Sequence, residues 1–289
     1  MSHRLINWML FILLCFIWGS SFMLMKLGIH ELSPYQVASI RLFSAGLVLV
    51  PFAVKALRAI PKRQLFFSIL SGLLGSFFPA YLFCLAQTRI DSSLAGILNA
   101  LTPLFTIILG VVFFRLKAAP NKWIGIITGF IGLSLLPFAA NKGVSLNDFS
   151  YSLLVLLATL LYGLNVNVVG TYLRAVNSIN IAALAFVFLM IPSGIILYFT
   201  GYFEQPLANP NYIRASVASA VLGIMGTAVA SILFYMLLKR AGALFASMVT
   251  YGIPFVAIFW GLLDNETITI WQVGCLGIIL TGVYLANRN

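Results

Sequence analysis

The sequence predicts an all-α integral membrane protein with ten transmembrane helices, arranged as two inverted five-helix repeats. Three observations predict this fold: an apolar composition, loops whose charges sort by their order along the chain, and a stretch that occurs twice. Of the 289 residues, 62% are hydrophobic and 8% are charged, whereas soluble domains carry roughly 25% charged residues. The chain is therefore expected in a lipid bilayer, with no room for a further soluble domain of ordinary size.

Ten apolar segments follow one another along the sequence, each long enough for a hydrocarbon core of roughly 30 Å. The first segment follows Arg4 and extends too far for the apolar core of a signal peptide, so we expect it to be retained as a helix. The expected spans are 6–28, 34–54, 65–87, 93–114, 122–140, 149–171, 180–201, 213–238, 243–263 and 270–287.

The charges of the connecting loops predict the orientation. The N-terminus, the even-numbered loops and the C-terminus carry only basic residues, whereas the odd-numbered loops and adjoining helix ends carry all six acidic residues. Basic residues favour the cytoplasm, so both termini are expected there. This distribution also accounts for the net charge of +11 without a nucleic-acid partner. The basic residues of the cytoplasmic side are Arg4, Lys55, Arg58, Lys62, Arg63, Arg115, Lys117, Lys122, Arg174, Lys239, Arg240 and Arg288.

One stretch occurs twice, at a separation of 151 residues. When Ala80–Phe105 is set over Ser231–Val256, five identities coincide, and two more follow when the register is extended. Five spans per half give the second half the opposite orientation, so we expect inverted repeats over residues 1–143 and 144–289. In transporters such repeats enclose a substrate near the midplane, although some channels have them as well.

The second apolar run of each copy contains a proline, Pro103 or Pro254. A helical proline leaves the carbonyl four residues earlier without its hydrogen bond, here the carbonyl of Asn99 or Thr250. In hydrocarbon such a carbonyl should face protein, water or a ligand. We therefore expect two kinked helices to meet at a binding site, with the prolines acting either as gating bends or as static kinks.

Neutral polar side chains are predicted at mid-depth in both halves. An aromatic–glycine pair occurs at Trp18–Gly19 and again at Tyr162–Gly163, followed by Ser21 in the first half and by Asn165 and Asn167 in the second. The glycine admits a close helix or a substrate, and the aromatic ring stacks or hydrogen-bonds. Alternatively, the serine hydroxyl bonds the preceding turn. The candidate substrate-binding residues are Trp18, Ser21, Tyr81, Asn99, Tyr162, Asn165, Tyr235 and Thr250.

Four side chains have two interpretations each. Tyr81 and Tyr235, near opposite ends of the third and eighth spans, line a vestibule or belong to the interfacial aromatic belt. Lys26 and Arg41 extend to the headgroups by snorkelling, or one of them attracts a substrate carboxylate. The sequence leaves these alternatives open.

Groups that carry intramembrane chemistry are absent from the predicted spans. No Asp or Glu lies in them, and His3 and His30 lie at segment ends. Proton relays usually use such groups, and hydrolysis needs a carboxylate pair, a metal or an activated nucleophile. We therefore expect neither an enzyme nor a metal or cofactor site. The three cysteines lack metal-ligand spacing and are expected as buried residues without a disulfide.

Glycines mark the last span of each predicted half. Gly125 and Gly129 form a GxxxG motif in the fifth span, and Gly274, Gly277 and Gly282 lie in the tenth. Such spacing permits close helix packing, either within the chain, which we favour, or between two copies. A monomer and a homodimer therefore both remain open.

Short motifs extend along nearly the whole chain: WGSSF from Trp18 with Lys26, SPYQVASIR ending at Arg41, KWIG from Lys122, the two proline segments, and Glu266, Gln272 and Gly282. In these motifs the chain resembles the drug/metabolite transporter superfamily, in its ten-helix EamA-type branch. The resemblance implies an inverted-repeat fold around a central cavity and export of amino acids or other small metabolites. The acid usual after the fourth helix is absent near Phe114–Arg115. Deep basic clusters for phosphate-bearing substrates are absent as well, which favours neutral or zwitterionic cargo.

The expected function is secondary transport of a small neutral or zwitterionic metabolite, such as an amino acid or related amphipathic compound, across the plasma (inner) membrane. Alternating access is the expected mechanism and export the expected direction, with the substrate and the lipid bilayer as partners. The alternatives are an uncoupled facilitator or exchanger, a channel, and a non-transport membrane assembly protein. Counterflow would argue against a channel, and saturable flux would exclude the assembly protein.

Overall fold

The computed structural model describes residues 3–116, 120–135, 139, 146–204 and 209–287. Every regular element within these ranges is a helix. Eight helical stretches among them are long and apolar enough to cross a membrane, and two shorter apolar helices, Lys122–Leu135 and Ile270–Ala286, complete the expected ten. The all-α, ten-helix membrane fold predicted from the sequence is confirmed. The predicted boundary between the halves, at 143/144, lies outside the described residues.

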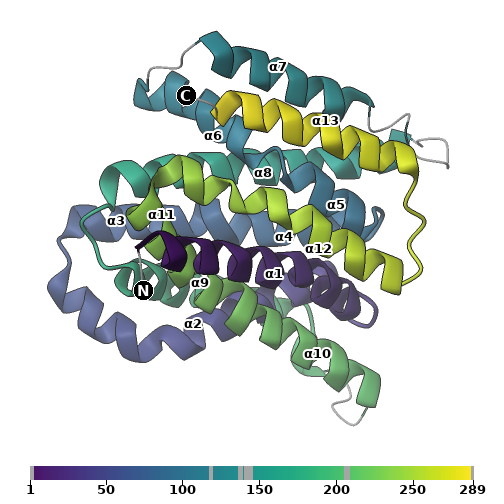
Figure 1. Ribbon diagram of the computed structural model, residues 1–289. Helices are drawn as coiled ribbons and strands as arrows, with labels where there is room; N and C mark the ends of the chain where they lie inside the picture. Colours follow the sequence, from purple (N-terminus) through teal and green to yellow (C-terminus); the bar gives the residue numbers. More distant parts are fainter. Residues whose placement is uncertain (1–2, 117–119, 136–138, 140–145, 205–208, 288–289) are drawn as a thin grey trace.

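The helices follow the predicted spans closely (Figure 1). In the first half they are α1 (His3–Ile29), α2 (Pro34–Ala59), α3 (Lys62–Gly72), the π-helical turn η1 (Leu73–Phe77), α4 (Phe78–Ala86), α5 (Ser92–Asn99), α6 (Thr102–Phe114) and α7 (Pro120–Leu135). In the second half they are α8 (Leu146–Tyr172), α9 (Ser178–Phe199), the 3-10 turn η3 (Tyr202–Glu204), α10 (Pro210–Gly223), the π-helical turn η4 (Ile224–Val229), α11 (Ala230–Ser247), α12 (Val249–Leu263) and α13 (Ile270–Asn287).

Local signals explain where individual helices begin and end. Ser33 precedes α2 and forms a capping box with Gln36, because each side chain bonds the other's backbone N–H. This exchange satisfies two N–H groups that the first turn of a helix leaves unpaired. Asn177 caps α9 through its side chain. In α11 the helix is interrupted at Gly242, whose φ of 88° suits glycine.

The third and eighth spans contain π-helical turns that the sequence analysis did not predict. The turn η1 begins at Leu73 and η4 begins at Ile224, so they start 151 residues apart, the same separation as the repeated stretch. A π turn adds one residue to a helical turn and frequently lies at a functional site. Both turns border the cavity described below.

Helices from the two ends of the chain pack together throughout the bundle. The two most extensive pairs are α2 with α9 and α7 with α13, while α1 packs on α12 and α10, and α8 packs on α6 and α4. In Figure 1 the α7–α13 pair lies along one edge of the molecule. The core therefore depends on contacts between the first five spans and the last five.

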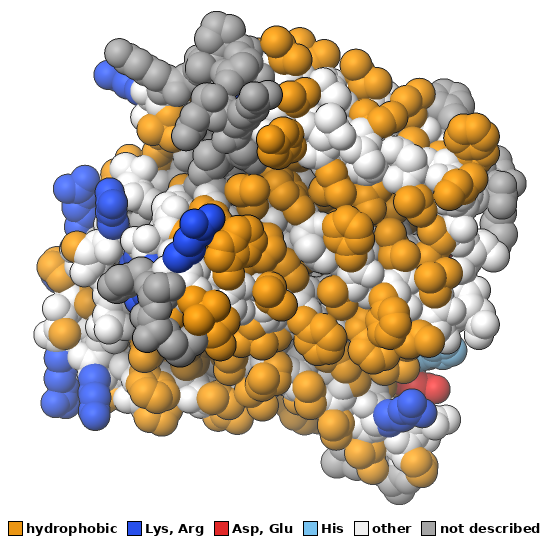
Figure 2. Space-filling view, in the orientation of Figure 1, with side chains coloured by type: hydrophobic (Ala, Val, Ile, Leu, Met, Phe, Trp, Pro, Cys, Tyr) orange, Lys and Arg blue, Asp and Glu red, His pale blue; other side chains and the backbone are white. Residues whose placement is uncertain are grey.

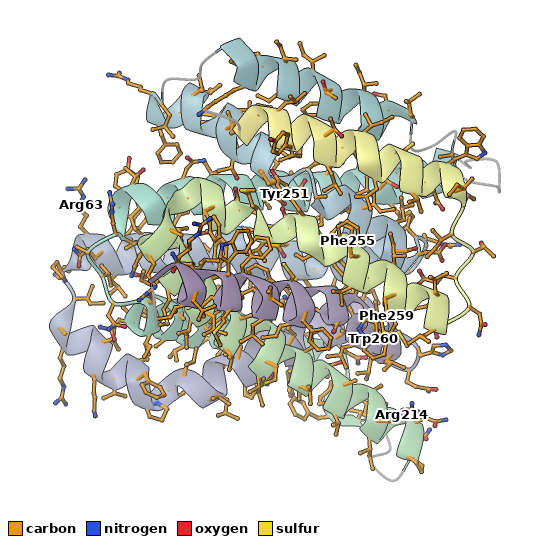
Figure 3. All side chains as sticks on the ribbon, in the orientation of Figure 1. Arg63, Arg214, Tyr251, Phe255, Phe259 and Trp260 are labelled. Atoms are coloured by element: carbon orange, nitrogen blue, oxygen red, sulfur yellow. The ribbon has the colours of Figure 1, made fainter. Side chains whose placement is uncertain are left out.

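The visible face of the molecule carries an apolar belt between two ends where the charged side chains lie (Figure 2). Figure 2 shows hydrophobic side chains across the middle of the visible face, with most of the Lys and Arg side chains gathered at the end where both termini lie in Figure 1. Arg63 and Arg214 mark the two opposite ends in Figure 3. On α12 between these ends, Phe255 and Phe259 are 59% and 55% exposed. Such an outward apolar surface is suited to lipid.

The predicted glycine motif packs within the chain. A Cβ on Gly282 of α13 would fall 2.6 Å from the carbonyl oxygen of Gly125 and 2.7 Å from Cα of Gly129, both on α7. The two backbones therefore approach each other directly, as small-residue motifs permit. In contrast, a Cβ on Gly274 or Gly277 would meet nothing within 4 Å.

Candidate functional site

A central cavity of about 90 Å³ lies within the bundle, lined by residues of both halves. Its wall combines aromatic rings with neutral polar side chains, the kind of lining that small-molecule sites have. Seven of the eight candidate binding residues line it: Trp18, Ser21, Asn99, Tyr162, Asn165, Tyr235 and Thr250. Residues that the sequence analysis did not single out complete the wall, including Ser76, Phe83, Thr227, Ser231 and Phe234. Several of these lie in or beside the unpredicted π turns, which explains why their orientation was missed.

Trp18 of α1 connects the cavity wall to a π turn. Its indole nitrogen donates to the carbonyl oxygen of Gly226 at 3.0 Å, and its ring lies 5.2 Å from the ring of Phe234. Gly226 lies inside η4, where the widened turn disturbs the regular hydrogen-bond ladder. The indole therefore supplies a donor to a backbone carbonyl at membrane depth.

Replacing Trp18 by phenylalanine should remove this donor while keeping an aromatic ring. We expect the free energy of unfolding to fall by about 1–3 kcal/mol, because a buried carbonyl loses its partner. Calorimetric unfolding in detergent would measure it, with Trp271→Phe as the control because Trp271 is 71% exposed. Equal melting temperatures for the two variants would contradict the assigned role.

Asn165 of α8 lies on the cavity wall and joins two other helices. Its Oδ1 accepts a hydrogen bond from the hydroxyl of Ser71 at 2.6 Å, and that hydroxyl lies 3.1 Å from the hydroxyl of Tyr235. Asn167 lies elsewhere, because its amide donates to the carbonyls of Thr106 and Gly163. Asn167, which the sequence places beside Asn165 at mid-depth, thus connects α8 to α6 and does not line the cavity.

The backbone carbonyl of Asn99, which Pro103 leaves without its helical hydrogen bond, has a partner nearby. It accepts the hydroxyl of Thr102 at 2.8 Å, at the break between α5 and α6. Pro103 lies in the first turn of α6, and Pro254 lies inside α12. Neither proline lines the cavity. Whether they act as gating bends stays a prediction.

Two hydroxyl groups on the cavity wall donate hydrogen bonds to backbone carbonyls of the preceding helical turn. Ser21 donates to the carbonyl of Ile17 at 2.8 Å, and Thr250 donates to that of Ser247 at 2.8 Å. These are the bonds to the preceding turn that were considered as the alternative for the serine. Both residues still line the cavity.

Two candidates lie away from the cavity wall. The hydroxyl of Tyr81 is 2.7 Å from that of Ser39, and its ring packs 5.0 Å from the ring of Phe77. Lys26 forms ion pairs instead, with Asp264 at 2.5 Å and Glu266 at 2.9 Å. The structure therefore corrects the placement of both residues on the substrate cavity.

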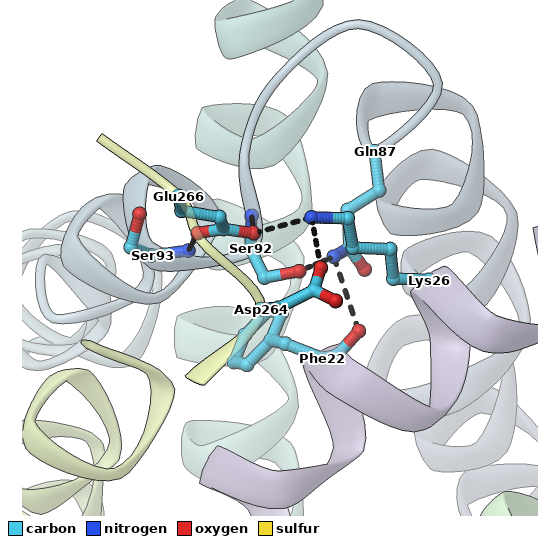
Figure 4. A network of polar contacts seen from close by, with 7 residues as sticks. All are labelled: Phe22, Lys26, Gln87, Ser92, Ser93, Asp264 and Glu266. Carbon is cyan, nitrogen blue, oxygen red and sulfur yellow. Dashed lines mark hydrogen bonds and ion pairs between the residues drawn. The ribbon is translucent and has the colours of Figure 1, made fainter. Parts of the chain in front are cut away.

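The ion pairs of Lys26 belong to a polar cluster of Lys26, Gln87, Ser92, Ser93, Asp264 and Glu266 (Figure 4). The cluster lies at the last turn of α1, next to the wall residues Phe22 and Met25. The Glu266 side chain is 2% exposed, and its carboxylate accepts the backbone N–H groups of Ser92 and Ser93 at 3.0 and 3.1 Å. These N–H groups begin α5, where a helix favours negative charge.

The pKa of Glu266 lies below its ordinary value of 4.5. Burial opposes the charge, but the Lys26 ammonium and the N–H groups of Ser93 and Ser92 outweigh that effect. Because the pKa is lower in the folded than in the unfolded protein, ionised Glu266 contributes stability above about pH 4.5. That contribution is lost as the pH falls through the folded-state pKa.

This linkage predicts a pH-dependent difference between wild type and Glu266→Gln. The wild type should melt at a higher temperature near neutral pH, and the difference should be smaller at an acidic pH below about 4.5, as the carboxylate becomes protonated on passing through its folded-state pKa. Calorimetry of the two proteins in detergent at both pH values would measure it. A difference that grows on acidification would contradict the assignment.

Arg41 of α2 points into the cavity. The residue is 8% exposed, and its Nε donates to the hydroxyl of Thr227 in η4 at 2.6 Å. It is thus enclosed within the bundle and does not extend along the lipid surface. Among the residues that the structure describes, Arg41 is the charged side chain lining the cavity, and none of their carboxylates lies within ion-pair distance of it.

The sequence matches the model of the EamA-like transporter family over residues 6–137 and again over 149–288. The chain belongs to the EamA-like transporter family. Together the two matches cover nearly all of the chain.

Related proteins extend over almost the whole chain. It is 25% identical over 277 residues to the uncharacterized inner membrane transporter YedA of Escherichia coli, covering 94% of this chain and 87% of YedA. It is 26% identical over 288 residues to an uncharacterized transporter of Archaeoglobus fulgidus, covering 98% and 99% of the two chains. A solved structure described as "Crystal structure of protein" has the same fold, with a TM-score of 0.68, 15% identity and coverage of 99% and 96%.

Proposed function

We propose that this EamA-family protein is a secondary carrier for a small neutral or zwitterionic metabolite, such as an amino acid or related amphipathic compound. The observation that carries the proposal is the central cavity, which draws its wall from helices of both halves and combines aromatic rings with neutral polar side chains. The named relatives are transporters, which supports transport over enzymatic activity. One relative is named as an inner membrane transporter, which supports the inner membrane as the location of this protein. The residues that line the cavity are the proposed substrate contacts.

Alternating access between two inverted halves, 1–143 and 144–289, is the mechanism we propose. Three features support it. The π turns η1 and η4 repeat at a separation of 151 residues, and α1 packs on α12 and α10 as α8 packs on α6 and α4. The polar cluster joins α1, α5 and the α12–α13 connection beside the cavity, where it would hold that end closed.

The orientation we propose places both termini in the cytoplasm, and export is the proposed direction. The basic end of the molecule, which carries both termini, supports the orientation because basic residues favour the cytoplasm. The polar cluster would then close the outer end of the cavity. Gly125 and Gly129 of α7 pack against α13 of the same chain. They are therefore not available for a contact between two copies, which favours a monomer over a dimer formed through those glycines.

Purified protein in proteoliposomes tests the proposal. A panel of radiolabelled amino acids should show saturable uptake for at least one member, with accelerated exchange when the vesicles contain the same unlabelled compound. Flux that rises without saturation and shows no exchange would indicate a channel. Absence of flux for the amino acids and for a matched panel of amphipathic amines and acids would contradict the carrier assignment.

A further inference from the structure

We propose that Arg41 forms a carboxylate subsite within the central cavity, so that the transported molecule is a carboxylic acid with an apolar or aromatic body. This inference rests on the proposed carrier function and specifies its substrate: a zwitterionic amino acid carries such a carboxylate, and a plain carboxylic acid would extend the class to anions. It starts from an electrostatic imbalance: a guanidinium stays charged at all physiological pH values, and an isolated charge buried at membrane depth is costly. An anionic ligand is the group that removes this imbalance.

The hydrogen bonds of Arg41 leave its two Nη groups free to bind a ligand. Its Nε is occupied by the hydroxyl of Thr227, which also donates to the carbonyl of Leu222. Neither of the two Nη groups has a hydrogen-bond partner among the described residues, and the residue lines the cavity. A guanidinium presents its N–H groups in a plane that matches the two oxygens of a carboxylate. The bond to Thr227 fixes that plane from one side.

A side-chain amide on the wall adds a further free donor. The Oδ1 of Asn165 accepts from Ser71, and the Oδ1 of Asn99 lies 3.4 Å from the hydroxyl of Thr102. The side-chain amide nitrogen of Asn165 lies within hydrogen-bonding reach of the Tyr235 hydroxyl, whereas that of Asn99 has no partner among the residues described in the structure. An amide nitrogen only donates. The cavity therefore offers unpaired donors, which favour oxygens that carry negative charge.

The aromatic residues of the cavity wall indicate the chemistry of the rest of the substrate. Tyr162 and Phe83 have ring centroids 6.0 Å apart with an interplanar angle of 24°, and Trp18 packs on Phe234. All four residues line the cavity. Aromatic walls favour flat or apolar groups through area burial and ring–ring contact. The lining contains no Asp or Glu among the described residues, so a substrate ammonium would meet hydroxyl and carbonyl oxygens only.

Four matched ligands test the subsite with full-length protein in detergent. They share a phenyl ring and differ in the polar group: 3-phenylpropanoate, its uncharged amide 3-phenylpropanamide, phenylalanine, and 2-phenylethylamine. Calorimetric titration of the wild type should show the acid binding on the order of 10- to 100-fold more tightly than the amide, the range expected for a buried charge-assisted hydrogen bond. The amine should bind more weakly than either carboxylate. Whichever of 3-phenylpropanoate and phenylalanine binds more tightly identifies a plain acid or an amino acid as the source of the carboxylate.

Variants then assign the preference to Arg41. Arg41→Gln should bind the acid and the amide within about threefold of each other, and Arg41→Lys should recover part of the preference because it keeps the charge. Arg214→Gln is the matched control, since Arg214 is exposed at one end of the bundle (Figure 3) and should keep the wild-type preference. A wild type that binds the amide as tightly as the acid, or an Arg41→Gln variant that keeps the preference, would overturn the proposal.

The wild-type comparison decides the matter even where Arg41→Gln fails to fold. The titration also separates this inference from the carrier function. Carboxylate-selective binding without saturable flux in proteoliposomes would sustain the subsite and contradict the carrier. Saturable flux of substrates without a carboxylate would do the reverse.

Discussion

Replacing Glu266 by glutamine is expected to lower the free energy of unfolding by about 3 kcal/mol, the lower end of the cost of removing one partner of a buried ion pair. The carboxylate is almost fully enclosed, and it holds the Lys26 ammonium and two backbone N–H groups at the start of α5 together. Glutamine keeps one acceptor oxygen but turns the other position into a donor, which would face N–H groups. Calorimetric unfolding in detergent measures the loss.

Asp264 supplies a matched control for this prediction. It also pairs with Lys26, but its side chain is 33% exposed. An exposed pair contributes about 0–1 kcal/mol, so Asp264→Asn should destabilise the protein far less than Glu266→Gln. If the two substitutions cost the same, the bonds from Glu266 to α5 carry no special weight, and the polar cluster would be an ordinary surface ion pair.

Replacing Gly282 by alanine is expected to destabilise the protein by about 2–3 kcal/mol, the cost of an overpacked contact that the backbone must relieve. The added methyl group would lie 2.6 Å from a carbonyl oxygen and 2.7 Å from a Cα of α7. Neither atom belongs to a flexible side chain, so α7 and α13 must move apart. Their mutual contact is the main one that each makes with the rest of the fold.

Gly277→Ala on the same helix should have the opposite sign. Its Cβ would meet nothing within 4 Å, and alanine is favoured over glycine inside a helix by about 0.5–1 kcal/mol. We therefore expect a small rise in melting temperature beside the large fall for Gly282→Ala. Equal effects at the two positions would contradict the packing of α13 on α7 described above.

Much of the fold follows from the sequence because lipid imposes a simple rule on length and charge. Within the described residues each expected span corresponds to one helix or to successive helices, and the break at Gly242 falls at the expected gap between the eighth and ninth spans. The π turns escaped prediction because one extra residue in a turn leaves an apolar segment just as apolar. Only the glycines beside them, such as Gly72 and Gly223, mark these segments in the sequence.

The candidate site was predictable where a polar group had to be buried, and less so where two interpretations had equal physical support. Asn99, Asn165 and Thr250 lie in the middle of membrane spans, where bulk water does not reach them, and all three line the cavity. Tyr81 and Lys26 differ, because each found a partner on another helix, Ser39 or Glu266. Pairings between distant segments leave no local pattern in one sequence, and the same holds for the bond from Arg41 to Thr227 that no spacing rule predicts.

The position of Trp18 gives this protein an internal optical probe. The other four tryptophans, Trp8, Trp123, Trp260 and Trp271, do not line the cavity. In a variant that keeps Trp18 alone, the emission of a single fluorophore would report the polarity of the cavity directly. Filling and emptying of the cavity could then be timed in unlabelled protein, on either side of a membrane.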